Sequence, residues 1–366
     1  MTATLFDGIV AHQVTSPRLT ANVLERPSGA GDGQSRAAGD PADPAAPAST
    51  VVFVHGNVSS ALFYQPTMLA LPAEVRALAI DLRGFGDSES LPVDATRGLS
   101  DFADDVVSVL DTLGVGAVHL VGWSMGGGVV MQILLDHADR VLTVTLEAPV
   151  SPYGFGGTKG ADGQRSSSDA AGSGGGGANP DFVARLERGD TSDEEGSPRN
   201  VYRTAYVKNA AGLPHEDDWV ASMLTTKTGV DNYPGDSVPS ENWPGFAPSA
   251  RGVLNTMTPD HLNLAGIVDL PTKPPILWIR GLDDAIVSDT SFFDLNFLGQ
   301  IGVIPGWPGA EAAPPQPMIT QTRAVLDAYA AAGGSYEELA WAECGHGPHL
   351  DKPAEFDAAL AKHVSQ

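Results

Sequence analysis

The feature that most constrains the fold is a series of short apolar runs, most of them rich in β-branched residues, that stop at a glycine or an acidic residue. Such runs are typical of parallel strands buried on both faces. Segments with helical periodicity separate them, for example residues 100–113, 127–136 and 352–364. This alternation predicts an α/β fold with a mostly parallel central sheet flanked by helices. The expected strands lie in residues 8–25 (two strands around a Ser-Pro turn), 50–56, 77–88, 118–122, 141–147, 274–281 and 333–341.

The alternation divides the 366-residue chain into a core and an insertion. It covers residues 1–150 and returns over residues 270–366, whereas residues 151–269 contain no clear βα repeat. We therefore expect the two outer stretches to form one α/β core, with the middle stretch inserted as a cap. Residues 28–49 are almost all Gly, Ala, Pro, Asp and Ser, and we expect a mobile loop there because they offer too little apolar bulk to fold.

Composition argues against several kinds of partner. The formal net charge is −24, from 45 acidic against 21 basic residues, and such a surface repels nucleic acid and anionic membranes. A single cysteine, Cys344, leaves no internal disulfide and no cysteine metal cluster. Residues 1–20 do not resemble a signal peptide, and no apolar stretch approaches membrane-spanning length. We expect a cytoplasmic protein that acts on a small molecule, with homo-oligomerisation left open.

The stretch LVGWSMGGGVV, residues 120–130, raises two chemical alternatives. It is either a serine held on a tight turn or a glycine-rich loop that binds a phosphate. A phosphate loop requires a lysine after its glycines, and a dinucleotide loop requires a glycine two residues after Gly122; neither is present. Residues 122–126 instead fit G-x-S-x-G between a strand and a helix, where the glycines remove collisions with the turn. The pattern predicts that Ser124 is a nucleophile.

Residues that would activate this serine follow later strands. A serine hydroxyl needs a histidine to accept its proton and a carboxylate to orient that histidine. Asp283 and Asp284 follow the expected strand at 274–281, and His346 and His349 follow the last expected strand. The chain order Ser, acid, His is the one expected when such a serine lies on a strand-to-helix turn of an α/β sheet.

The core resembles the α/β-hydrolase superfamily in five stretches. These are VFVHGN (52–57), DLRGFGDS (81–88), GWSMGG (122–127), IRGLDDAIV (279–287) and GHGPHLDKP (345–353). The resemblance implies that Ser124 is the nucleophile, that Asp284 is the triad acid and that His346 is the base. It further implies an oxyanion hole formed by the backbone N–H groups of Asn57 and Met125.

Other residues near these motifs have alternative interpretations. Some members of the superfamily carry the acid after the strand that ends here at Glu147, which makes Glu147 the alternative acid. Asp283 is expected to be a turn residue, and His349 a structural residue that caps a helix or lines the cavity. His55 is expected to support its loop without taking part in catalysis.

The resemblance also leaves two regions without a counterpart. The interval between Asp284 and His346 is longer than the family pattern, and its aromatic, proline-rich stretch at 292–317 is expected either to cover the site or to form a subunit contact. Aromatic residues in and near the cap are candidates for an apolar substrate pocket. These candidates are Trp123, Tyr153, Phe155, Trp219 and Trp243.

The identity of the nucleophile limits the reaction. Relatives that open epoxides or displace halide use aspartate there, so Ser124 favours acyl transfer. The first interpretation is hydrolysis of a carboxylic ester, lactone or amide of a small, largely apolar substrate through an acyl-enzyme. A carbon–carbon bond hydrolase or an acyltransferase with the same triad is the alternative, and a non-catalytic ligand receptor of this fold is less favoured. We expect no cofactor and no metal, because the sequence holds no nucleotide motif and no metal-binding cluster.

Overall fold

Eight strands form one central sheet in the computed structural model, which describes residues 4–29 and 49–366. Across the sheet they are β1 (Val10–Thr15), β2 (Thr20–Arg26), β4 (Arg76–Ile80), β3 (Thr50–Val54), β5 (Val118–Trp123), β6 (Val141–Glu147), β13 (Ile276–Gly281) and β14 (Tyr336–Trp341). Strand β2 pairs antiparallel with β1 and β4, and all other pairs in the sheet are parallel. The predicted mostly parallel sheet is confirmed. Most of the loop expected at 28–49 lies outside the described residues.

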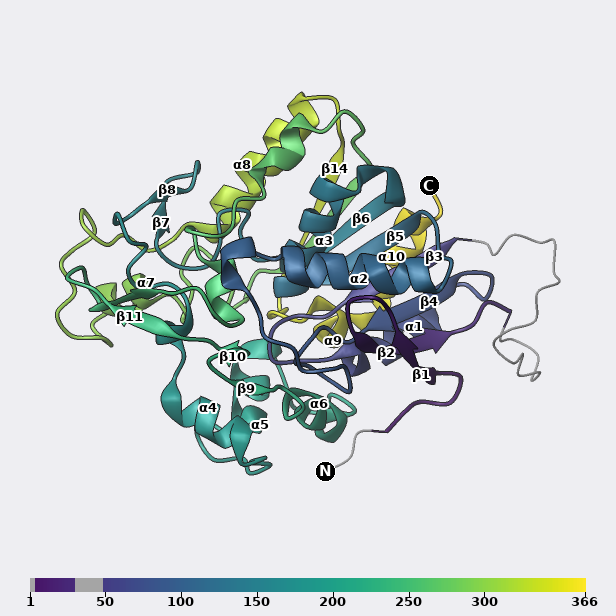
Figure 1. Cartoon of the computed structure of the whole chain (residues 1–366), viewed down its shortest axis with the longest axis horizontal. Helices are drawn as coiled ribbons and strands as arrows, with labels where there is room; N and C mark the ends of the chain where they lie inside the picture. The colour runs from purple at the N-terminus through teal and green to yellow at the C-terminus, as the bar shows by residue number, and fades with distance from the viewer. Residues whose placement is uncertain (1–3, 30–48) are drawn as a thin grey trace.

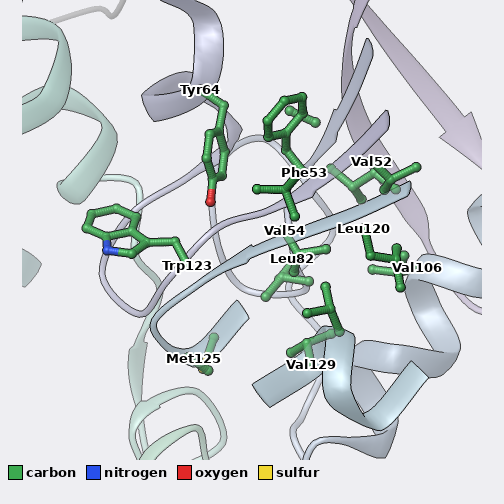
Figure 2. Packing of buried hydrophobic residues seen from close by; sticks show 14 of the residues in the cluster. Val52, Phe53, Val54, Tyr64, Leu82, Val106, Leu120, Trp123, Met125 and Val129 are labelled. Atoms are coloured by element: carbon green, nitrogen blue, oxygen red, sulfur yellow. The ribbon is translucent and has the colours of Figure 1, made fainter. Parts of the chain in front are cut away.

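Helices cover both faces of the sheet (Figure 1). Helices α2 (Ser100–Thr112) and α3 (Met125–Asp136) pack against each other on one face, and α1 (Gln65–Ala70) and α10 (Pro353–Val364) contact each other on the opposite face. Figure 2 shows Phe53 and Tyr64 on one side of the strands and Val106 and Val129 on the other. Every residue of β3 and β5 is buried, because helices cover both faces of these strands, and most of these residues are apolar.

The helix boundaries differ from the expected ones at α2 and α3. Helix α2 ends at Thr112, one residue before its expected end, with Leu113 as its C-cap. Helix α3 begins at Met125, two residues before its expected start, because the turn at Ser124 leads directly into it. Sequence periodicity does not reveal this start, since glycines occupy the first turn of the helix.

The register of the central strands brings several strand ends to the same edge. Val54 lies opposite Gly122, so β3 and β5 end side by side. Trp123 lies opposite Glu147, and Ile279 of β13 lies opposite Glu147 on its other side. The loops that follow β3, β5, β6 and β13 therefore emerge together, at the edge where ligands bind in open parallel sheets.

All strands of the central sheet come from residues 10–147 and 276–341. The stretch of residues 151–269, which the sequence predicts as an insertion and which is called the inserted segment below, contains α4 (Pro180–Glu187), α5 (Pro198–Val201), a π-helical turn (Tyr202–Tyr206) and α6 (Glu216–Met223). Its strands are β7 (Thr158–Lys159), β8 (Gln164–Arg165), β9 (Thr228–Gly229), β10 (Tyr233–Pro234), β11 (Ser237–Pro239) and β12 (Phe246–Pro248). They pair only with one another, and in Figure 1 the teal-to-green insertion lies mainly to the left of and below the sheet.

The remaining elements complete the C-terminal part of the core and the connections. They are α7 (Leu295–Gln300), α8 (Met318–Ala331) and α9 (Pro348–Asp351), with 3₁₀ turns at Ala61–Tyr64, Ala95–Arg97, Ala138–Arg140, Gly175–Gly177, Leu254–Met257 and Ala265–Asp269. The 292–317 stretch contacts the inserted segment: Gln316 Oε1 accepts from the Gly156 N–H (2.6 Å) and its Nε2 donates to the Gly154 carbonyl (3.0 Å). No helix among the described residues has the length and apolar character needed to cross a membrane.

Candidate active site

Ser124 lies on a sharp turn between β5 and α3, with φ 56° and ψ −118°. Such a backbone costs about 1–3 kcal/mol in a non-glycine residue and persists only where the surroundings hold it. The Ser124 N–H donates to the Glu147 carbonyl (2.9 Å), and the Ser124 carbonyl accepts from the N–H groups of Gly127 and Val150 (3.0 Å each). Figure 2 shows its neighbours Trp123 and Met125 at the end of the strand, and the serine itself is partly exposed.

The glycines around Ser124 are required by close backbone contacts. A Cβ on Gly126 would overlap the carbonyl oxygens of Val54 and His55, and one on Gly122 would overlap the carbonyl of Gly126. Since these neighbours are backbone atoms, they cannot move aside as a flexible side chain would. The G-x-S-x-G spacing thus follows from the approach of α3 to β3.

Replacing Gly126 with alanine is expected to lower the free energy of unfolding by about 3 kcal/mol, the upper range for over-packing a filled site. Gly116→Ala is the matched control, because no atom lies within 4 Å of a Cβ built there and its φ is ordinary. That variant is expected to stay within about 0.5 kcal/mol of wild type. Urea unfolding of both variants measures the difference, and equal midpoints would show that the turn does not depend on this contact.

His346 and Asp284 form a buried pair. The Nδ1–H of His346 donates to Asp284 Oδ2 (2.9 Å), and both side chains are at most 3% exposed. Asp284 Oδ1 accepts from the N–H groups of Ile286 (2.8 Å) and Val287 (2.9 Å), which fix the carboxylate. Because Nδ1 is engaged, Nε2 is the ring nitrogen left to exchange a proton. The indole Nε1–H of Trp123 donates to the His346 carbonyl (2.7 Å) and joins this loop to the residue before Ser124.

Asp283 points away from this pair. Its Oδ1 accepts from Lys208 Nζ (2.8 Å) in the inserted segment, and this bond holds the pKa of the Asp283 carboxyl below its usual range. Asp283 therefore links the loop after β13 to the insertion. The adjacent residue, Asp284, is the one that orients His346.

Glu147 pairs with the second histidine. Its Oε1 accepts from the backbone N–H (2.9 Å) and the Nδ1–H (2.6 Å) of His349, and its Oε2 lies 3.4 Å from the Tyr64 hydroxyl. Glu147 and His349 are fully or almost fully buried. The two carboxylates thus serve different histidines, and only Asp284 orients His346.

The loop that follows β3 and the first residue of α3 carry the candidate oxyanion donors. Among residues 4–29 and 49–366, neither the Asn57 N–H nor the Met125 N–H donates to another residue. Met125 opens α3, so its N–H lies at the positive end of the helix dipole. Val58, next to Asn57, has φ 49°, a strained value for a β-branched residue.

His55 supports this loop in a neutral form. Its Nδ1–H donates to the Gly56 carbonyl (2.7 Å), and its Nε2 accepts from the Leu82 N–H (3.0 Å). Burial lowers the pKa of His55 to about 4, so the ring is uncharged at neutral pH. The geometry agrees with a supporting role.

The candidate pocket aromatics fall into two groups. Trp123 is 1% exposed and Trp219 is 2% exposed; both pack on Phe63, with ring centroids 5.3 and 5.0 Å away. These two tryptophans therefore expose almost no surface, and their place in a substrate pocket stays a prediction. Tyr153, Phe155 and Trp243 are half-buried.

Sequence reasoning missed Tyr206, whose hydroxyl donates to the carbonyls of Asn57 (3.1 Å) and Val58 (3.0 Å). It is one of several aromatic residues in the insertion, and no motif distinguishes it. Within the described ranges, no three or more His, Cys, Asp or Glu side chains are grouped to hold a metal ion.

Comparison with known proteins finds sequence similarity over part of the chain. A sequence model of the alpha/beta hydrolase fold matches residues 49–167. The dihydrolipoyllysine-residue acetyltransferase component of the acetoin cleaving system from Cupriavidus necator is 40% identical over 112 residues, 30% of this chain. Carboxylesterase YbfK from Bacillus subtilis is 29% identical over 106 residues, 29% of this chain. These alignments span 28% and 36% of the two relatives' lengths.

Solved structures match over almost the whole chain. The superposition on the YbfK (CesB) crystal structure covers 97% of this chain and 91% of the YbfK chain, with a TM-score of 0.56 at 16% identity. The 2-hydroxy-6-oxo-6-phenylhexa-2,4-dienoate hydrolase from Rhodococcus sp. strain RHA1 covers 98% and 99%, with a TM-score of 0.57 at 16% identity. The chain therefore has the α/β-hydrolase fold.

Proposed function

We propose that the protein is a serine hydrolase that cleaves a carboxylic ester of a small, largely apolar substrate, with lactones and amides as related substrate classes. The observation that carries the proposal is a strained serine turn joined, through Trp123, to the loop of a buried Asp284–His346 pair. The alignment with carboxylesterase YbfK, which covers part of the chain, supports an ester substrate.

The chemistry follows from the roles of the three side chains. His346 Nε2 takes the proton of the Ser124 hydroxyl as its oxygen attacks the substrate carbonyl, and Asp284 stabilises the imidazolium through Nδ1. His346 then gives this proton to the leaving alcohol. In the second half-reaction, His346 removes a proton from water, which attacks the acyl-enzyme and releases the acid.

The negative charge that develops on the carbonyl oxygen needs fixed donors. The N–H groups of Asn57 and Met125 have no protein partner among the described residues; Asn57 lies on the loop after β3, and Met125 directly follows Ser124 at the start of α3. Losing one such donor lowers kcat by about 10²–10³-fold. We propose these two groups as the oxyanion hole.

The substrate class follows from the half-buried aromatics and the charge. Tyr153, Phe155 and Trp243 offer apolar ring surface for an acyl or alcohol group. A net charge of −24 disfavours polyanionic partners and supports a small neutral or cationic ester as substrate. We also propose a cytoplasmic location and leave subunit number to measurement.

A panel of p-nitrophenyl esters from acetate to decanoate, a γ-lactone, an anilide and a vinylogous diketone tests this function. We expect many turnovers on the esters, with a preference among chain lengths. Efficient cleavage of the diketone with slow cleavage of every ester would instead identify a carbon–carbon bond hydrolase. Covalent labelling of the serine without turnover on any panel member would contradict ester hydrolysis and favour a receptor.

A further inference from the structure

Tyr206 belongs to the inserted segment but lies among the groups of the candidate active site. It ends the π-helical turn Tyr202–Tyr206 and is 5% exposed. Its ring stands edge-on to that of Trp123, with centroids 5.4 Å apart and planes at 89°, and its centroid lies 6.2 Å from that of His346. Isolated π-helical turns are rare and frequently occur at functional sites.

The Tyr206 hydroxyl contacts the strained part of the oxyanion loop. It donates to the carbonyls of Asn57 (3.1 Å) and Val58 (3.0 Å), so two successive carbonyls converge on one donor. Such convergence requires a sharp turn, and Val58 adopts φ 49° there. Burial raises the pKa of Tyr206 well above the ordinary range, so its hydroxyl remains a donor at any working pH.

The Tyr206 backbone contacts the histidine loop. The Gly347 N–H, next to His346, donates to the Tyr206 carbonyl (2.8 Å). Two residues further on, the Lys208 N–H donates to Asp351 Oδ2 (2.9 Å), and the same oxygen accepts from the Gly345 N–H (2.6 Å). The insertion therefore bonds directly to residue 347, and it reaches residue 345, on the other side of His346, through the shared acceptor Asp351.

We propose that Tyr206 is a positioning residue that aligns the oxyanion loop with the catalytic histidine, which makes the inserted segment part of the catalytic machinery. The inference rests on the proposed function, because alignment matters only if Ser124 attacks a carbonyl. The hydroxyl fixes the carbonyl of Asn57 and thereby the orientation of the adjoining peptide groups. The Asn57 N–H then points to the position where the oxyanion forms.

A purely structural role would have a different consequence. If the hydroxyl only stabilised the fold, its loss would lower the melting temperature and leave kcat of the folded enzyme unchanged. If it aligns an oxyanion donor, its loss lowers transition-state binding more than substrate binding. Kinetics and inhibitor affinity separate these two roles.

Tyr206→Phe removes the hydroxyl and keeps the ring. Tyr202→Phe is the matched control, because Tyr202 is fully buried on the same π-helical turn and its hydroxyl has no partner among the described residues. For Tyr206→Phe we expect kcat to fall about 30-fold and KM to stay within about 3-fold of wild type. The fall in kcat is smaller than for loss of an oxyanion donor, because the Asn57 N–H is displaced but still present. Tyr202→Phe is expected to keep both values within about 2-fold.

Affinity for an aryl trifluoromethyl ketone gives the second readout, because its serine adduct places an oxyanion in the same position. We expect its inhibition constant to rise in Tyr206→Phe by about the factor by which kcat/KM falls, and to stay unchanged in Tyr202→Phe. A wild-type inhibition constant and kcat in folded Tyr206→Phe would overturn the inference while leaving the hydrolase intact. A wild type that neither turns over the esters nor binds the ketone would overturn the proposed function itself.

Discussion

Ser124→Ala is expected to lower kcat on the preferred p-nitrophenyl ester by about 10⁵-fold, because it removes the only atom that can form the acyl-enzyme. The residual rate comes from substrate binding and from the oxyanion donors, which remain in place. The free energy of unfolding is expected to change little, since alanine and serine have the same backbone strain at φ 56°.

The matched control is Ser108→Ala, a serine on α2 remote from the site motifs. Its kcat is expected to equal that of wild type. Steady-state rates, with urea unfolding to show that both variants are folded, provide the measurement. If Ser124→Ala retained more than about a tenth of the wild-type rate, Ser124 would not be the nucleophile and the proposed mechanism would be wrong.

Asp284→Asn is expected to lower kcat by about 10³–10⁴-fold with the fold preserved. The asparagine amide can present a donor to Nδ1 and favour the tautomer that carries its proton on Nε2, which cannot accept the serine proton. The bonds from Ile286 and Val287 to Asp284 Oδ1 can be kept by the asparagine oxygen, which argues against a collapse of the loop.

The comparison variant is Glu147→Gln, because both carboxylates pair with a histidine Nδ1 at the same edge of the sheet. Glu147→Gln is expected to lower the melting temperature, since it weakens a fully buried pair, and to keep kcat within about 10-fold of wild type. Single-turnover rates of the two variants measure the contrast. The opposite order of effects would make Glu147 the triad acid.

The central sheet and the serine turn were predictable because local sequence encodes them. Both β3 and β5 are buried along their whole length, so their apolar runs directly indicate internal strands. The glycines on either side of Ser124 are required by contacts with neighbouring backbone, and this requirement gives the motif its fixed spacing.

The inserted segment was not predictable in the same way. Its strands are only two or three residues long, so no periodicity develops. The bond from Tyr206 to Asn57 joins residues 149 positions apart, and the bond from Glu147 to His349 joins residues 202 apart. Such contacts depend on how the insertion and the last loop pack over the sheet edge. The burial of Trp219 against Phe63 likewise depends on tertiary packing and not on the local sequence.

Reaction of the folded wild-type protein with a fluorophosphonate probe, followed by peptide mapping with mass spectrometry, tests the central claim most directly. The probe forms a stable adduct with a serine whose hydroxyl is activated as a nucleophile in a folded active site. We expect one adduct per chain, on the peptide that contains Ser124, with no adduct after denaturation or in His346→Ala. A protein that stays unlabelled, or that is labelled at another residue, would contradict Ser124 as the nucleophile.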